Sequence, residues 1–183
     1  MKARRKIARP SKALAAKLAR VKLFLCDVDG VLTNATVFIG DGREFKEFHI
    51  QDGLGMRLLQ REGIKVGWIS NRPSTATQQR ADELKIDFLH QDKGSKVEAA
   101  AAILVHARLT WDDVCYVGDD VVDLGAMRRA GVAVAVANAI DEAKTLADYV
   151  TQAEGGHGAV REVAGLILQA QGRWQRLVKQ YSK

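Results

Sequence analysis

The sequence predicts one α/β domain in which helices cover both faces of a mostly parallel sheet, the doubly wound arrangement. Short, nearly continuous apolar runs alternate with helical patterns, which is typical of βαβ units whose sheet is buried on both faces. The 183 residues suit a single domain, and 47% hydrophobic with 27% charged residues is an ordinary globular composition. We expect this domain over 21–171, between a basic N-terminal extension (1–20) and a basic C-terminal tail (172–183).

Apolar runs give the strands, and amphipathic stretches between them give the helices. The expected strands lie at 21–28, 64–70, 87–90, 113–119 and 132–136, with a shorter sixth at 148–150. The expected helices lie at 52–62, 74–84, 95–107, 121–130 and 139–146. A last helix carries Val160, Val163, Ala164, Ile167 and Ala170 on one face, and Trp174 and Leu177 are candidates to extend it. Residues 11–20 are a further helix candidate.

One segment, residues 34–49, interrupts the alternation. Val37, Phe38 and Ile39 form a short apolar run, Gly40-Asp41-Gly42 supplies turn residues, and a second run follows over 44–48. This pattern predicts a β-hairpin between the first strand and the first helix. Because a lone two-stranded hairpin is marginal in water, we expect it to pack on the body or on another subunit.

The net charge of +6 conceals two opposite regions. Residues 1–22 hold nine Lys and Arg, residues 172–183 hold four, and neither segment holds an acid, so the body between them has a net charge of −7. A basic arm can bind nucleic acid or an anionic surface. No nucleic-acid motif or interleaved aromatic residue accompanies the charge, so we favour a solvated extension and expect neither a nucleic-acid nor a membrane partner.

The cysteine content and hydropathy favour the cytoplasm. Cys26 and Cys115 each lie in an apolar run and are interpreted as core residues rather than a disulfide framework. No run approaches the ~20 apolar residues of a membrane span. The N-terminus is basic but lacks a continuous apolar stretch, so it is a poor secretory signal.

Polar residues follow three of the expected strands, at the sheet edge where open parallel sheets bind ligands. They are Asp27 and Asp29 after the first strand, Ser70, Asn71 and Arg72 after the second, and Asp119 and Asp120 after the strand that begins near residue 113, with Asp123 close behind. A single aspartate in such a place is more simply a strand end or a helix cap. Two acidic strand ends with a lysine nearby favour a functional site.

The acidic residues require a cation. Five carboxylates at one edge would repel one another, and burying an unpaired charge is costly. Oxygen ligands without His or Cys favour Mg²⁺. Lys96 supplies a further cation, with Lys93 as the alternative in the same DKGSK segment. A nucleophilic carboxylate, a second carboxylate, Mg²⁺, a lysine and a hydroxyl together indicate phosphoryl transfer.

The order of these motifs resembles that of the haloacid dehalogenase phosphatase superfamily, whose fold is Rossmann-like. DVDGVLT (27–33), the hydroxyl after the second strand, the downstream lysine and GDDVVD (118–123) resemble its four motifs. From about residue 22 to 170 the chain resembles the branch of 3-deoxy-D-manno-octulosonate 8-phosphate phosphatases. The hairpin in place of a cap domain, Asp52-Gly53 after it, VAVAVANA (132–139) and GGHGAVREV (155–163) carry this resemblance.

The resemblance implies a role for each motif residue. Asp27 would be the nucleophile that carries the phosphoryl group, and Asp29 the general acid and base. Lys96 would neutralise developing charge. The carboxylates of Asp27 and Asp119 and the backbone carbonyl of Asp29 would bind Mg²⁺, and Asp120 and Asp123 would support Lys96 and metal-bound water. Ser70 and the N–H of Asn71 would bind the phosphate. Arg72 and Asp52 would contact the rest of the substrate.

The same resemblance implies a Mg²⁺-dependent phosphatase of lipopolysaccharide biosynthesis, assembled as a homotetramer in which hairpins help to wall neighbouring sites. Arg72 favours the octulosonate substrate, because a relative acting on a nine-carbon sugar acid 9-phosphate carries glutamate there. The chain departs from the branch at Asn71, where glycine is usual, and at Ser70, where threonine is commoner. The alternatives are another acidic sugar phosphate as substrate, or a receiver-like or non-catalytic protein of similar fold.

Overall fold

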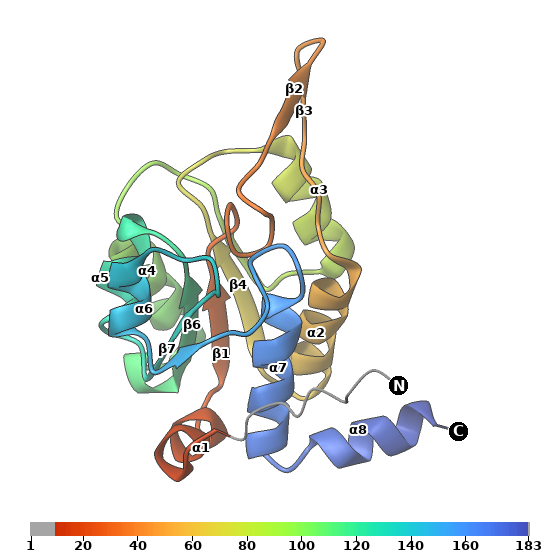
Figure 1. Ribbon diagram of the computed structural model, residues 1–183, viewed down its shortest axis with the longest axis vertical. Helices are drawn as coiled ribbons and strands as arrows, with labels where there is room; N and C mark the ends of the chain where they lie inside the picture. The colour runs from red at the N-terminus through yellow and green to blue at the C-terminus, as the bar shows by residue number, and fades with distance from the viewer. Residues whose placement is uncertain (1–9, 183) are drawn as a thin grey trace.

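The computed structural model describes residues 10–182, which form a six-stranded parallel sheet with helices on both faces (Figure 1). The strands are β1 (Leu23–Cys26), β4 (Lys65–Ile69), β5 (Phe88–His90), β6 (Val114–Gly118), β7 (Val132–Ala135) and β8 (Tyr149–Val150). Their order in the sheet is β5-β4-β1-β6-β7-β8, and every neighbouring pair is parallel. The predicted doubly wound sheet is therefore confirmed.

Strand β1 lies at the centre of the sheet, between β4 and β6. Its residues are buried on both faces, and Phe24 pairs with Val66 on one side and Cys115 on the other. The chain first builds β4 and β5 outward from β1 and then returns to β6 on its other side. The topological switch point thus falls between β1 and β6, and ligands bind beyond the strand ends at such a point.

Helices α2 (Ile50–Arg61), α3 (Thr75–Leu84) and α7 (Ala159–Ala170) lie on one side of the sheet. On the other side lie α4 (Lys96–Ala107), α5 (Leu124–Met127) and α6 (Asp141–Leu146) (Figure 1). The stretch predicted as one helix over 121–130 begins instead with a 3₁₀ turn, Val121–Asp123, and α5 ends at Met127. A second 3₁₀ turn, Trp111–Asp113, leads into β6.

The expected hairpin is present as β2 (Phe38–Gly40) and β3 (Arg43–Phe45), and it projects beyond the body of the domain (Figure 1). Asp41 and Gly42 both have positive φ, +50° and +68°, as a two-residue turn between twisted strands requires. Phe38, Ile39 and Phe45 are exposed. The second strand is shorter than the predicted run over 44–48.

Both basic ends carry helices that pack on the domain. Helix α1 (Lys12–Ala19) buries Leu14 and Leu18 in the main core beside α7. The interpretation of 1–20 as a solvated extension is therefore wrong for this helix, and residues 1–9 lie outside the described residues. Helix α8 (Trp174–Tyr181) is separate from α7, because Gly172 turns the chain with φ +69°. Trp174 and Leu177 therefore belong to α8 and do not extend α7, and Leu177 is buried.

Within residues 10–182, no helix has the length and apolar character needed to span a membrane.

Candidate active site

Asp27 follows β1 directly and lies at the switch point. Its backbone N–H continues the ladder by donating to Val117 O at 3.0 Å, which holds the residue beside the end of β6. The residue is only 6% exposed. The chain then turns at Gly30, where φ is +112°. The central strand therefore ends in a buried carboxylate with Asp29 two residues beyond it.

Lys96 joins Asp27 to Asp123. The Lys96 Nζ lies 2.7 Å from Asp27 Oδ1 and donates to Asp123 Oδ1 at 2.7 Å. Lys96 starts α4, whose preceding residue Ser95 caps the helix by accepting the N–H of Glu98. Lys96 is buried, whereas Lys93 in the same loop is exposed. Of the two lysines left open by the sequence, the structure brings Lys96 to the acidic residues.

Asp123 is fully occupied by hydrogen bonds. In addition to Lys96, the Tyr116 hydroxyl donates to its Oδ1 at 2.8 Å. The backbone N–H groups of Asp119 and Asp120 donate to its Oδ2 at 3.2 and 3.4 Å. Asp123 thus holds Lys96 against Asp27 and ties the loop after β6 into the site.

The two remaining carboxylates carry raised pKa values. Burial, together with the charge of Asp123, raises the pKa of Asp27 to about 6, although Lys96 opposes the shift. Burial and the charges of Asp27 and Asp123 raise the pKa of Asp119 to about 8. Burial alone would lower the pKa of the Lys96 ammonium, but Asp27 and Asp123 outweigh burial and raise it. The positive charge near Asp27 and Asp119 is therefore too small to balance their carboxylates, while Lys96 stays protonated.

This donor set fits a hard divalent cation. One oxygen each of Asp27, Asp119 and Asp123 lie within 4.8 Å of one another. Asp119 Oδ1 is buried and has no hydrogen-bond partner within residues 10–182. Because Asp123 is already occupied, Asp27 and Asp119 are the carboxylates that remain for a metal. Carboxylate oxygens without His or Cys suit Mg²⁺, in agreement with the cofactor expected from the sequence.

Two glycines permit the close packing of the loops around this cluster. A Cβ on Gly30 would lie 2.0 Å from Asp119 Oδ2. A Cβ on Gly155 would lie 1.7 Å from the backbone oxygen of Gly30. The loop after β1 therefore sits directly between Asp119 and the glycine-rich segment that precedes α7.

A cavity of about 220 Å³ opens beside the cluster. It is lined by Asp27, Asp29, Ser70, Asn71, Arg72, Lys96, Asp120 and Val122. The buried Ser70 hydroxyl accepts the N–H of Arg72 at 3.1 Å, which fixes the loop after β4. The structure thus brings most of the residues singled out from the sequence to one cavity.

Two of those residues have other contacts than expected. Asp52 is 2% exposed and accepts the backbone N–H groups of Gly158 at 3.2 Å and Arg161 at 2.6 Å, so its carboxylate caps α7. It does not line the cavity beside Asp27. The Asp120 carboxylate accepts the N–H of Val121 at 2.6 Å, whereas Lys96 is held by Asp123 together with Asp27.

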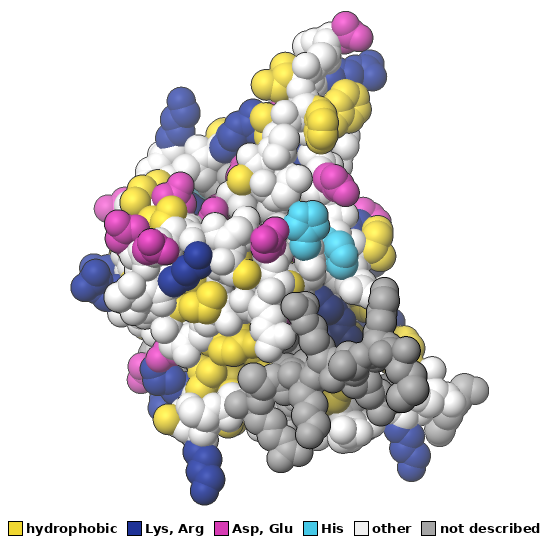
Figure 2. Space-filling view, in the orientation of Figure 1, with side chains coloured by type: hydrophobic (Ala, Val, Ile, Leu, Met, Phe, Trp, Pro, Cys, Tyr) yellow, Lys and Arg dark blue, Asp and Glu magenta, His cyan; other side chains and the backbone are white. Residues whose placement is uncertain are grey.

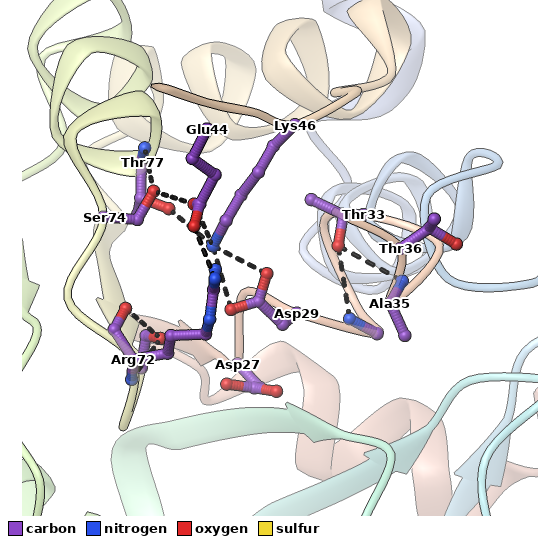
Figure 3. Close-up of polar contacts among 12 residues, drawn as sticks. Asp27, Asp29, Thr33, Ala35, Thr36, Glu44, Lys46, Arg72, Ser74 and Thr77 are labelled. Atoms are coloured by element: carbon purple, nitrogen blue, oxygen red, sulfur yellow. Dashed lines mark hydrogen bonds and ion pairs between the residues drawn. The ribbon is translucent and has the colours of Figure 1, made fainter. Parts of the chain in front are cut away.

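Sequence reasoning missed two charged residues at the base of the hairpin, Glu44 and Lys46 (Figure 3). Lys46 Nζ lies 2.7 and 2.9 Å from the two carboxylate oxygens of Asp29. Glu44 Oε2 lies 2.5 Å from Arg72 Nη2, and this ion pair lowers the pKa of Glu44. One signal was available, because Glu44 and Lys46 alternate along an extended segment and so face the same side.

A buried aspartate at the end of the central parallel strand, held by a lysine and facing a second acidic strand end, defines a phosphatase of the haloacid dehalogenase class. Residues 88–163 match the haloacid dehalogenase-like hydrolase family. Over 159 residues the chain is 39% identical to the 3-deoxy-D-manno-octulosonate 8-phosphate phosphatase KdsC of Escherichia coli K12, covering 86% of this chain and 85% of that protein. The chain therefore belongs to the KdsC family of phosphatases.

Solved structures agree with this assignment. The 3-deoxy-D-manno-octulosonate 8-phosphate phosphatase of Moraxella catarrhalis, in complex with magnesium ion, phosphate ion and a KDO molecule, has a TM-score of 0.90 and 36% identity. The match covers 92% of this chain and 97% of that one. The cobalt-bound enzyme of Haemophilus influenzae has a TM-score of 0.87 and 36% identity, over 91% of this chain and 99% of that one. The family resemblance expected from the sequence is confirmed.

Proposed function

We propose that this chain hydrolyses 3-deoxy-D-manno-octulosonate 8-phosphate to the free sugar acid and phosphate, as a cytoplasmic step of lipopolysaccharide biosynthesis. The observation that carries the proposal is the buried Asp27, held by Lys96 at 2.7 Å and opening on a cavity that Arg72 also lines. The free, buried Cys26 and Cys115 agree with a reducing compartment.

In the first step, a carboxylate oxygen of Asp27 attacks phosphorus and the bond to the sugar oxygen breaks, leaving an aspartyl-phosphate. Lys96 fixes Asp27 Oδ1 and brings positive charge to the phosphoryl oxygens. Asp29 protonates the departing sugar oxygen. When bound at Asp27 and Asp119, Mg²⁺ supplies further neutralisation of phosphoryl charge.

In the second step, Asp29 removes a proton from water, and the oxygen of that water attacks the aspartyl-phosphate. The phosphorus–Asp27 bond breaks, phosphate leaves and both carboxylates return to their starting state. Asp29 thus gives a proton in one step and regains it in the next. Its carboxylate contacts Lys46 rather than joining the group of Asp27, Asp119 and Asp123, which supports a role in proton transfer.

Arg72 supports a sugar acid as the substrate. Its Nη2 pairs with Glu44, while its Nη1 is buried with no hydrogen-bond partner among the described residues. A guanidinium with one free nitrogen beside the catalytic cavity suits the carboxylate of such a substrate. The second candidate substrate is a nine-carbon sugar acid 9-phosphate, because its carboxylate could meet the same nitrogen of Arg72. Asn71, where the chain departs from the branch, lines the same cavity.

We also propose a homotetramer whose hairpins meet at its centre. Phe38, Ile39 and Phe45 are 59%, 76% and 58% exposed, and hydrophobic side chains cluster on the projecting hairpin in Figure 2. Burying such side chains between subunits is favourable. Light scattering at micromolar concentration tests this proposal, and a monomer would contradict it.

The test of function is phosphate release in Mg²⁺ from octulosonate 8-phosphate, nine-carbon sugar acid 9-phosphates and hexose phosphates. We expect the highest kcat/KM for octulosonate 8-phosphate. Asp27→Asn should abolish turnover without unfolding the chain. The control Asp112→Asn, at an exposed position before β6, should leave turnover unchanged. Equal, weak turnover of all substrates would agree with a phosphatase but would contradict octulosonate 8-phosphate as its specific substrate.

A further inference from the structure

The side chain of Lys46 is a buried charge in a segment that is otherwise partly exposed. Lys46 follows β3 directly, and its side chain is 0% exposed although Phe45 beside it is 58% exposed. Figure 3 shows the side chain extending from the hairpin segment toward Asp29. A buried ammonium is costly unless it is paired, so its partners indicate its purpose.

The nearest partner of Lys46 is Asp29. Its Nζ lies 2.7 Å from Asp29 Oδ1 and donates to Asp29 Oδ2 at 2.9 Å. Asp29 is the general acid and base of the proposed function. Among residues 10–182, no other cationic group lies within ion-pair distance of Asp29.

Two further contacts hold Lys46 from the other side. Its Nζ donates to Thr77 Oγ1 at 3.2 Å, and Thr77 is buried in the first turn of α3. Glu44 Oε1 lies 3.8 Å away, and that carboxylate also accepts the Ser74 hydroxyl at 2.7 Å. The ammonium is therefore anchored to α3 and to the hairpin before it reaches Asp29.

Lys46 does not line the cavity that Asp27, Asp29 and Arg72 share. It lies behind Asp29 and lines the neighbouring groove between the hairpin and α3 instead. Lys46 is thus placed to act through Asp29 and not on the phosphoryl group itself.

We propose that Lys46 is a positioning residue, which holds the Asp29 carboxyl in the orientation needed to protonate the leaving oxygen and so couples the hairpin to the chemistry. This inference rests on the proposed function, because it needs Asp29 as the general acid. It adds that the position of the hairpin sets the position of Asp29. A general acid that is misplaced by about 1 Å loses much of its effect.

The dependence on the leaving group distinguishes positioning from a merely structural role. An alkoxide such as a sugar oxygen must be protonated as it departs, whereas p-nitrophenolate leaves without help. The ratio kcat/KM reports only the steps up to departure of the leaving group. Loss of a correctly placed acid therefore lowers kcat/KM for sugar phosphates and spares p-nitrophenyl phosphate.

The experiment compares Lys46→Met with the unchanged protein on octulosonate 8-phosphate and on p-nitrophenyl phosphate, in Mg²⁺. We expect a fall of about 100-fold on the sugar phosphate, since general acid catalysis typically contributes 10²–10⁴-fold. On p-nitrophenyl phosphate we expect a much smaller change. Lys46→Arg should restore part of the lost sugar phosphatase activity. Lys93→Met, in an exposed loop, should leave kcat/KM unchanged for both substrates.

Thr77→Val keeps the ammonium and removes one of its anchors, so it should cause a smaller loss with the same selectivity, even if Lys46→Met unfolds. Equal losses on both substrates in these variants, or no loss at all, would overturn the inference. Asp29→Asn separates the two proposals. If Asp29→Asn is selective and the Lys46 and Thr77 variants are not, only the role of Lys46 fails. If Asp29→Asn is itself unselective, the assignment of Asp29 as general acid fails.

Discussion

The ammonium of Lys96 lies 2.7 Å from Asp27 Oδ1, and both residues are less than 10% exposed. This single buried cation faces three carboxylates, since Asp119 and Asp123 belong to the same group. The excess of negative charge is what raises the pKa of Asp27 and of Asp119. A divalent cation bound at these carboxylates would balance this excess, and would also favour the entry of an anionic phosphate group.

Lys96→Met should lower kcat/KM for the sugar phosphate by about 100-fold or more, because it removes a charge that stabilises the transition state. It should also lower the free energy of unfolding by about 3–5 kcal/mol, the usual result of removing one partner from a buried ion pair. Phosphate release and urea unfolding measure the two effects. Lys93→Met, in the same loop but exposed, is the matched control. Equal effects of the two substitutions would contradict the role of Lys96.

Gly30→Ala should weaken metal binding as well as stability. The new Cβ would lie 2.0 Å from Asp119 Oδ2 and would push that carboxylate out of the cluster. Gly63 also has a positive φ, +78°, but nothing lies within 4 Å of its Cβ position. Both substitutions therefore strain the backbone, by about 1–2 kcal/mol, and only the first displaces a carboxylate. The Mg²⁺ concentration for half-maximal activity should rise for Gly30→Ala and stay unchanged for Gly63→Ala.

The metal-free protein should lose stability as the pH rises from about 4 to about 8. Burial and neighbouring charge raise the pKa of Asp27 from 3.8 to about 6 and that of Asp119 from 3.8 to about 8, so the folded state binds more protons than the unfolded state in this range. Their stabilising effect is fully present below the unfolded pKa and is lost above the folded pKa.

Urea unfolding in EDTA at several pH values measures this slope. Mg²⁺ binds the ionised carboxylates of the folded state, so adding it should flatten or reverse the slope. Asp119→Asn removes the group with the larger shift and should flatten the slope in EDTA. A slope that is unchanged by this substitution would show that the dependence on pH arises elsewhere.

The arrangement of strands was predictable because it follows from local apolar patterning. Phe24 and its neighbours in β1 are buried on both faces, and a continuous apolar run is the sequence signal for that environment. The fate of the two ends was not predictable in this way. Leu18 becomes buried only when distant helices assemble around it, and the high local content of Lys and Arg suggested a solvated extension instead. Leu177 was expected to extend the preceding helix, whereas it is buried from a separate one.

The candidate site shows the same division. Asp27 and Asp119 follow strands directly, so the topology alone brings them together at the switch point. Lys46 reaches Asp29 only because the hairpin folds over α3. The spacing of Glu44 and Lys46 places both on one side of the segment but does not indicate what that side contacts. Asp52 accepts hydrogen bonds from backbone N–H groups 106 and 109 positions away. Its Asp-Gly motif alone therefore could not show whether it caps a helix or binds substrate.

The packing of α1 makes a direct prediction about the N-terminal segment. Leu18 is 1% exposed and belongs to the main core. Leu18→Ala should lower the free energy of unfolding by about 2–5 kcal/mol, the usual cost of removing a buried leucine side chain. Val105→Ala, at a position that is 80% exposed on α4, should change it by less than about 0.5 kcal/mol. Urea unfolding measures both changes in free energy. Similar values for the two variants would mean that α1 does not unfold together with the rest of the domain.

Arg72 should select for the carboxylate of the substrate. Its Nη1 is buried beside the catalytic cavity without a partner among residues 10–182, while Glu44 fixes its Nη2. A hydrogen bond to a charged group is worth about 1.5–3 kcal/mol, so Arg72→Ala should raise KM for octulosonate 8-phosphate by about 10- to 150-fold. KM for a hexose phosphate, which has no carboxylate, should change little.

The control for Arg72 is Arg128→Ala, a change of the same charge at an exposed position beyond α5. It should leave both KM values unchanged. Equal increases in KM for both substrates after Arg72→Ala would assign Arg72 to the phosphate group, which the two substrates share. Because Glu44 also pairs with Arg72, Glu44→Gln should loosen the guanidinium without removing it. We therefore expect an increase in KM for the sugar acid phosphate that is smaller than that of Arg72→Ala.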